Sequence, residues 1–243
     1  AGIARTQGDA AAWQFSLGQG AAAAAAGAEG DFAIGFTDEA GRGFLAVDRF
    51  AIRTMCYRVI EDRLHFATRA DELAALPPRA ALDPQAIFDY LYFHVIPSPR
   101  TVFQGVYRLP PAHFALFEDG KLTVAPYWVP EYREAASADF DSLAAEFRQL
   151  VRDAVATQLD GSKPACFLSG GTDSSTVAGM IGEVAGRPAA TYSIGFEAEE
   201  YDELGFARLA AQRFNLDSVE LQVKPADVTE AIPAIAAAFE GDT

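Results

Sequence analysis

The sequence predicts an α+β domain over residues 1–130 and an α/β domain with a parallel sheet over residues 140–243. Short apolar runs separated by turn residues dominate the first part, whereas helical and strand patterns alternate in the second. Alternation of helix and strand is typical of parallel strands joined by helical crossovers. A polar stretch at residues 131–139 is predicted to be the linker between the two domains.

The first domain is expected to be mostly β-structure. Its predicted strands cover residues 31–37, 44–47, 56–60, 64–67, 113–117 and 122–124. One helix should interrupt them, with Asp83 as N-cap and Pro84 at the first helical position, and it should end before Pro97. The alanine run Ala21 to Ala26 is expected to be a small-residue linker or a helical fragment.

The second domain is expected to begin with a helix whose apolar face carries Leu143, Phe147, Leu150, Val151 and Ala154. A short buried strand should follow at residues 165–168, and a helix should begin near Asp173. Further strands are predicted at residues 191–196 and 218–223. The helix between these two strands is expected to open at Asp202.

Composition excludes several classes of function. The chain has 243 residues, a net charge of −15 and a pI near 4.5, which is unlike a nucleic-acid-binding protein. No apolar run is long enough for a membrane helix and no signal peptide is visible, so a cytoplasmic protein without a membrane partner is expected. Cys56 and Cys166 are predicted to be buried and reduced, and the three histidines are predicted to be structural.

A glycine- and serine-rich turn at residues 168–175 carries the chemistry. The glycines allow the backbone to approach a ligand, and free N–H groups at the start of the following helix point outward. With the helix dipole, these groups form an anion site, to which the serine hydroxyls add donors. The turn lacks the Gly-Lys ending of a P-loop and the third spaced glycine of a dinucleotide fingerprint.

Asp173 would repel a bare phosphate at this place. Its presence is explained if it binds a Mg²⁺ ion that bridges the phosphates. The alternative is an ordinary acidic residue in the first turn, which the helix dipole favours.

The turn at residues 167–175 resembles the pyrophosphate loop of the asparagine synthetase family. Residues 192–196, 201–203 and 207–211 are similar to the family's next block. In the first domain, residues 47–53 resemble another family segment, from which Ala51 and Thr54 depart. Residues 96–103 and 109–111, with Tyr127 and Trp128, resemble segments that close the family's first domain.

This resemblance implies a degenerate glutaminase-like domain, an Ntn-type sandwich, followed by the N-terminal part of an ATP-pyrophosphatase domain. It implies ATP and Mg²⁺ as cofactors, with Asp173 as the metal ligand and the backbone near Leu168 and Ile194 facing the adenine. The catalytic residues stay unknown. The nucleotide-binding residues implied are Leu168, Ser169, Gly170, Gly171, Asp173, Ser174, Ser175, Ile194 and Gly195.

The chain departs from the family at both ends. Ala1 stands where the resemblance implies a nucleophilic cysteine, and the segments that hold glutamine are not recognisable. The family's second acidic block does not occur before Thr243, so the α/β domain is expected to be truncated at its C-terminus. Glu240 falls near a substrate-site glutamate of the family.

Three functions stay open at this point. The first is an AMP-forming amide ligase that activates a carboxylate without a working glutaminase. The second is a lasso-peptide, macrolactam or β-lactam cyclase of the same superfamily, and the third is an ATP-binding fragment without catalysis. The expected partner is a small-molecule or peptide carboxylate, and a homodimer is a possibility that the sequence leaves open.

Overall fold

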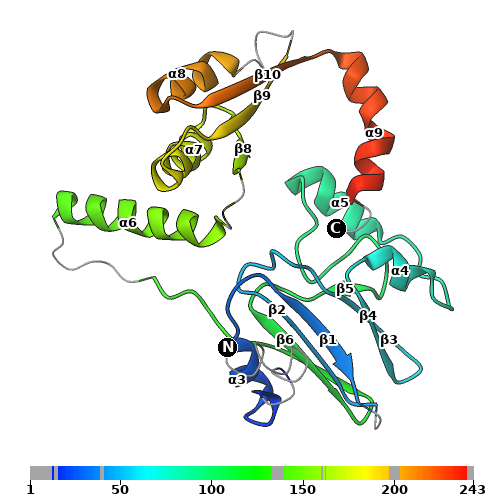
Figure 1. Ribbon diagram of the computed structural model, residues 1–243. Helices are drawn as coiled ribbons and strands as arrows, with labels where there is room; N and C mark the ends of the chain where they lie inside the picture. Colours follow the sequence, from blue (N-terminus) through cyan, green and yellow to red (C-terminus); the bar gives the residue numbers. More distant parts are fainter. Residues whose placement is uncertain are drawn as a thin grey trace. The chain divides into compact units, whose positions relative to one another are not determined.

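The computed structural model describes residue 13 and residues 16–38, 41–132, 139–159, 161, 163–196 and 203–239 (Figure 1). The chain divides into two compact units. One comprises Ala1–Tyr132 with Ile235–Thr243, and the other comprises Arg133–Ala234. Within the described residues, no helix is both long enough and apolar enough to cross a membrane.

The first unit contains a four-stranded antiparallel sheet with the order β1-β2-β6-β7. Its strands are β1 (Ala33–Thr37), β2 (Gly43–Val47), β6 (His113–Glu118) and β7 (Lys121–Pro126). All five residues of β2 are buried. Because successive side chains of a strand point to opposite faces, both faces of the sheet must be covered at β2.

A second antiparallel sheet has the order β4-β3-β5. Its strands are β3 (Cys56–Ile60), β4 (Arg63–Ala67) and the short β5 (Tyr107–Arg108). The predicted strands of both sheets are therefore confirmed, whereas the two-residue β5 was not expected.

The two sheets share one apolar core, in which Leu45 and Val47 of β2 pack with Tyr57 of β3 and with Phe66 of β4. On the other face of β2, Phe44 and Ala46 pack with helix α3 (Ala21–Ala26). On the other face of β3, Cys56 packs with Leu73 and Ala74 of helix α4 (Ala70–Ala75). The first unit thus has a helix, a sheet, a sheet and a helix in successive layers (Figure 1).

Helix α5 (Pro84–Phe93) is the helix that the sequence predicted in this unit. The carboxylate of Asp83 accepts a hydrogen bond of 3.0 Å from the Gln85 N–H, and the helix ends at His94 with a φ of 58°. Helix α3 is the helical fragment that was one of the two expectations for the alanine run, whereas α4 was not predicted. Helix α4 has no side-chain N-cap, so the usual signal of a helix start is missing.

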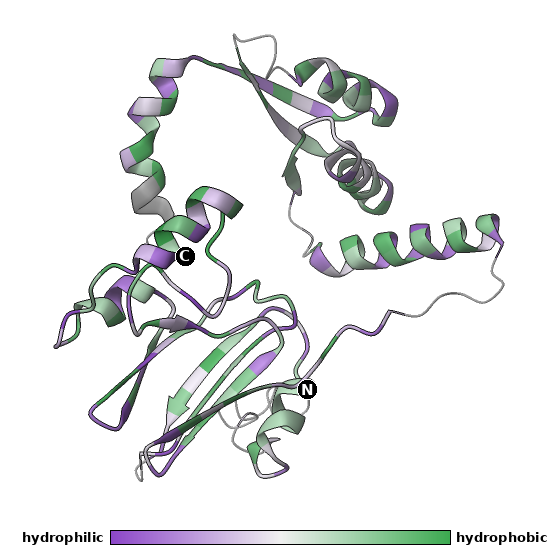
Figure 2. Ribbon diagram, turned by 180° about the vertical axis from the view of Figure 1, so that it is seen from behind, coloured by the Kyte–Doolittle hydropathy of each residue, from purple (hydrophilic) through white to green (hydrophobic). Residues whose placement is uncertain are grey.

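The second unit contains a parallel sheet with the order β10-β9-β8, as predicted. Its strands are β8 (Ala165–Phe167), β9 (Ala190–Phe196) and β10 (Asp217–Val223). Helix α6 (Phe140–Gln158) precedes them, and α7 (Thr172–Ala185) and α8 (Leu204–Phe214) connect them. Hydrophobic and hydrophilic residues alternate around α6, as Figure 2 shows. Asp202, predicted to open α8, lies outside the described residues.

The expectation of a buried strand at residues 165–168 was wrong for β8 itself. Cys166 is half-buried beside a cluster that contains Ala178 and Ala207, but Phe167 is 79% exposed. The reason is that α7 and α8 cover one face of the sheet, whereas Phe167, like its neighbour Tyr192 in the central strand β9, lies on the exposed face. Helix α9 (Pro225–Phe239) was not predicted, and it contains Pro233, a residue that usually interrupts helices.

Candidate functional site

The predicted loop lies where β8 ends and α7 begins, at the carboxyl edge of the parallel sheet. Leu168 is buried, and its N–H donates to the Tyr192 carbonyl at 2.9 Å. The hydroxyl of Ser193, which is also buried, donates to the Leu168 carbonyl at 2.7 Å. Both backbone groups of Leu168 are therefore tied to β9, which fixes the point where the loop leaves the sheet.

Gly170 brings the loop into direct contact with the start of α8. Its φ is 86°, in the left-handed region, and a Cβ atom there would lie 2.5 Å from the Ala207 nitrogen. The same atom would lie 2.6 Å from the Phe206 carbonyl carbon. Only glycine meets both the conformational and the spatial requirement at this position.

Two serines cross-link the loop. The Ser169 and Ser174 hydroxyl oxygens are 3.0 Å apart, and the Ser169 N–H donates to the Ser174 oxygen at 3.3 Å. The Gly171 N–H donates to the Ser169 oxygen, also at 3.3 Å. These long bonds hold the loop in shape, and they involve the donors that would turn toward an anion.

The N-terminus of α7 is open. Gly171 is its N-cap and supplies no side-chain hydrogen bond, while Gly171, Thr172 and Asp173 are exposed. The first N–H groups of this fourteen-residue helix therefore lack a side-chain cap, and the helix dipole adds partial positive charge there. This is the arrangement that binds phosphates and other anions at helix N-termini.

The remaining predicted site residues differ in how exposed they are. Ile194 is 49% exposed, at the same edge of the sheet as the loop. Gly195 is buried, and a Cβ atom there would lie 2.2 Å from the Leu204 side chain, so this glycine makes room for α8. The Ser175 hydroxyl is buried, does not face solvent and has no hydrogen-bond partner among the described residues.

The contacts that support the loop from β9 and α8 were not predicted. Ser193 and Ala207 are far from the loop along the chain, and their roles follow from tertiary contacts with Leu168 and Gly170. The contact between Ala207 and Gly170 can be recognised only when the packing of α8 against the loop is known.

The described residues contain no group of three or more His, Cys, Asp or Glu side chains that could hold a metal alone. Asp173 contributes one exposed carboxylate, which forms no hydrogen bond or ion pair in the described part of the chain. Mg²⁺ is usually held by one or two carboxylates together with phosphates of the substrate. A single free carboxylate beside an open helix N-terminus fits that pattern.

Neither cysteine has the environment of a reactive thiol. Cys56 is fully buried and Cys166 is half-buried, and burial raises the pKa of both thiols. For Cys56, the nearby Arg108 opposes this effect only in part. Nucleophilic cysteines are partly exposed and have lowered pKa values, so neither residue matches that class.

The fold and the loop define a protein with an antiparallel two-sheet domain followed by an α/β domain that has a phosphate-loop-like turn. The family model for a glutamine amidotransferase domain matches residues 4–128, and the model for asparagine synthase matches residues 146–243. The chain belongs to the asparagine synthetase family.

Three relatives illustrate the range of this similarity. Asparagine synthetase 1 (glutamine-hydrolyzing) of Bacillus subtilis is 27% identical over 80% of this chain and 31% of its own length. Asparagine synthetase 3 (glutamine-hydrolyzing) of the same organism is 31% identical over 65% of this chain and 26% of its own. Amidase chyE of Penicillium rubens is 33% identical over 64% of this chain and 24% of its own. The chain thus spans less than a third of the length of each.

Proposed function

We propose that the protein is an ATP-dependent, AMP-forming amide ligase that activates a carboxylate by adenylation. The observation that carries this proposal is the uncapped N-terminus of α7, preceded by the loop that Gly170 and Ser193 hold at the sheet edge. Family membership supports the same reaction class, because two of the relatives are named asparagine synthetases.

Each part of the loop has a distinct role in this proposal. Ser169, Gly171 and Ser174 bind the pyrophosphate portion of ATP with backbone N–H and hydroxyl groups, at the positive end of α7. Gly170 keeps the loop close to α8, and the surface near Leu168 and Ile194 receives the adenine. Asp173 holds Mg²⁺, which when bound neutralises charge on the leaving pyrophosphate.

We also propose that the first unit is a glutaminase-like, Ntn-type sandwich without glutaminase activity. Its successive helix, sheet, sheet and helix layers support the assignment of the fold. The loss of activity is supported by the two cysteines of the chain, whose burial and raised pKa values do not suit a nucleophile. The amine must then come from ammonia or from the substrate.

Two classes of substrate follow from this. Aspartate with ammonia would give asparagine, whereas a substrate with its own amine would give a macrolactam or a β-lactam. The proposed loss of glutaminase activity favours the second class, because an enzyme that cyclises a substrate with its own amine needs no ammonia at all. A relative that is named an amidase is consistent with different substrates within the family.

Pyrophosphate and AMP release by the purified protein would test the proposal. The assay compares aspartate plus ammonium, aspartate plus glutamine, and a leader-bearing precursor peptide. Release with ammonium alone indicates asparagine formation, and release with the peptide alone indicates cyclisation. Activity with glutamine would contradict the absence of glutaminase. ATP binding without AMP formation from any substrate would instead indicate a non-catalytic ATP-binding protein.

A further inference from the structure

Within the described residues, the outer edge of strand β1 has no partner strand. β1 is the outer strand of its sheet, and within the described residues it pairs only with β2. The Phe32 carbonyl accepts from the Asp48 N–H at 2.9 Å, so the backbone of Phe32 points toward β2. In an antiparallel ladder this direction alternates, and the N–H and C=O groups of Ala33 and Gly35 therefore point away from β2. No strand in the described part of the chain pairs with these groups.

The opposite edge of the same sheet is protected, and β1 is not. Strand β7 carries Pro126 at an outward-facing position and begins with Lys121, two features that discourage edge pairing. The sequence of β1, Ala-Ile-Gly-Phe-Thr, contains neither a charge nor a proline. Proteins usually protect an outer strand by charges or proline, and β1 carries neither of these features.

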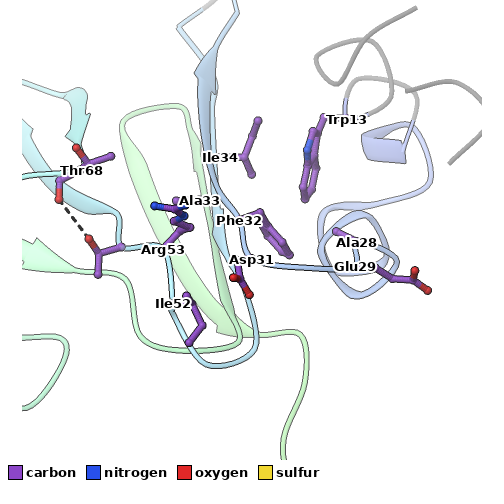
Figure 3. Close-up of a pocket in the computed structure, with 11 residues that line it drawn as sticks. Trp13, Ala28, Glu29, Asp31, Phe32, Ala33, Ile34, Ile52, Arg53 and Thr68 are labelled. Atoms are coloured by element: carbon purple, nitrogen blue, oxygen red, sulfur yellow. Dashed lines mark hydrogen bonds between the residues drawn. The ribbon is translucent and has the colours of Figure 1, made fainter. Parts of the chain in front are cut away.

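A cavity of about 540 Å³ surrounds the start of this edge. In Figure 3, Trp13 and Phe32 lie on one side of the β1 ribbon and Arg53 lies on the other. The two aromatic ring centroids are 5.3 Å apart, and Ile34 and Ile52 add to the apolar lining. The volume is within the usual range for ligand pockets and exceeds what one side chain needs.

The charged side chains around the cavity limit which ligands can bind there. The backbone N–H of Arg53 donates to Asp48 at 3.0 Å, which fixes the loop, but its guanidinium forms no ion pair within the described chain. It is the only basic side chain among the described residues that line the cavity. Glu29 and Asp31 also line it, so a ligand with several acidic groups would be repelled.

We propose that the β1 edge binds an extended peptide by strand addition. The peptide backbone pairs with Ala33 and Gly35, one apolar side chain enters the cavity beside Trp13 and Phe32, and one carboxylate pairs with Arg53. This mode of recognition takes affinity from main-chain hydrogen bonds and specificity from side-chain pockets. The inference does not rest on the proposed ligase activity, since binding is measured without ATP.

A positional-scanning library of acetylated and amidated hexapeptides tests the proposal by fluorescence anisotropy with the purified protein. The expected result is selection for an aromatic or branched side chain at one position and for a single acidic side chain nearby. Arg53→Gln should remove the acidic preference and keep the apolar one. Arg63→Gln, which changes an exposed arginine outside the cavity, should leave both preferences unchanged.

Proline substitution tests the strand addition itself. Ala33→Pro removes an outward N–H that the β1–β2 ladder does not use, and it should weaken peptide binding about tenfold or more. Val124→Pro makes the same change on the outward edge of β7 and should have no effect on binding. If Ala33→Pro does not fold, peptides with an N-methylated backbone replace it and should fail to bind.

Three results would overturn the proposal. They are a library without positional selection, equal effects of Ala33→Pro and Val124→Pro, and undiminished binding of N-methylated peptides. Sedimentation analysis adds a fourth. A wild-type dimer that becomes monomeric with Ala33→Pro would show that a second copy of the chain, and not a peptide, occupies the edge.

Discussion

Gly170 and Ala207 lie so close together that a Cβ atom at position 170 would be 2.5 Å from the Ala207 nitrogen. Gly170→Ala must therefore push the loop away from α8, in addition to the strain of its positive φ. We expect ATP binding to be lost and the free energy of unfolding to fall by about 2–4 kcal/mol. Calorimetry and urea unfolding measure the two effects.

Gly186 provides the matched control for this substitution. It also has a positive φ, 64°, but a Cβ atom there would meet no heavy atom within 4 Å. Gly186→Ala should therefore cost only the conformational term, about 1 kcal/mol, and leave ATP binding intact. Equal losses of ATP binding in the two variants would contradict the proposed contact between the loop and α8.

Ser193 and the Leu168 carbonyl form the second support of the loop. Ser193→Ala leaves that buried carbonyl without its hydroxyl donor, which should lower the free energy of unfolding by about 1–3 kcal/mol. Thr176→Ala removes a hydroxyl that bonds the Thr172 carbonyl on the exposed side of α7, and it should be nearly neutral. Chemical denaturation of both variants checks this difference, and an equal cost would refute it.

Asp48 should make the first unit sensitive to acid. Burial alone would raise the pKa of this carboxyl, but N–H groups of Arg53, Ile52, Phe50 and Phe32 donate to it and lower the pKa overall. The pKa of Asp48 in the folded protein lies below the ordinary value of 3.8. Asp48 therefore contributes its full stabilisation of the folded state above about pH 3.8. This stabilisation is lost as the pH falls through the folded pKa.

Asp48→Asn should therefore lower the free energy of unfolding at neutral pH by about 1–3 kcal/mol, because an amide cannot accept all four bonds. Below about pH 4, the free energy of unfolding of the variant should also fall less than that of the wild type. Asp62→Asn, in an exposed turn, is the control. Thermal unfolding between pH 2 and 7 measures both effects, and parallel curves for wild type and Asp48→Asn would show that Asp48 is not responsible.

The two cysteines should react with iodoacetamide at very different rates. Cys56 is fully buried and burial raises the pKa of its thiol, so the native protein should protect it until it unfolds. Cys166 is half-buried and should react first, though slowly, since burial raises its pKa as well. Mass spectrometry of the labelled protein measures the order. Rapid labelling of Cys56 in the folded protein would remove the support for an inactive glutaminase-like domain.

Local signals explain how much of this structure could be predicted from the sequence. The Asp83–Pro84 pair predicts the start of α5, and the alternation of strand and helix patterns predicts the parallel sheet. The loop at residues 168–175 was found for the same reason, because its glycines and serines are contiguous. Helix α4 was missed because it begins without a capping side chain.

The contacts around the loop could not be predicted because they join distant parts of the chain. Gly195 was assigned to the nucleotide, yet it is buried against Leu204. Phe167 was expected in a buried strand, but it lies on the exposed face of the sheet and is 79% exposed. The burial of both residues depends on tertiary packing, which the composition of the segment does not determine.

Asp173 offers the sharpest test of the site, because its two interpretations predict opposite results. If it holds Mg²⁺, Asp173→Asn should weaken binding of Mg²⁺-ATP about tenfold or more, since a charge-assisted contact is lost. In EDTA the same variant should bind ATP at least as well as wild type, because a repelling carboxylate has been removed.

Asp141, in the first turn of α6, shows what a simple dipole effect contributes. Asp141→Asn removes the same charge from the same place on a helix, but far along the chain from the loop. It should change stability slightly and leave ATP binding unchanged with or without Mg²⁺. If Asp173→Asn behaves like Asp141→Asn, the carboxylate at position 173 only favours the helix start, and the metal must be held by other groups.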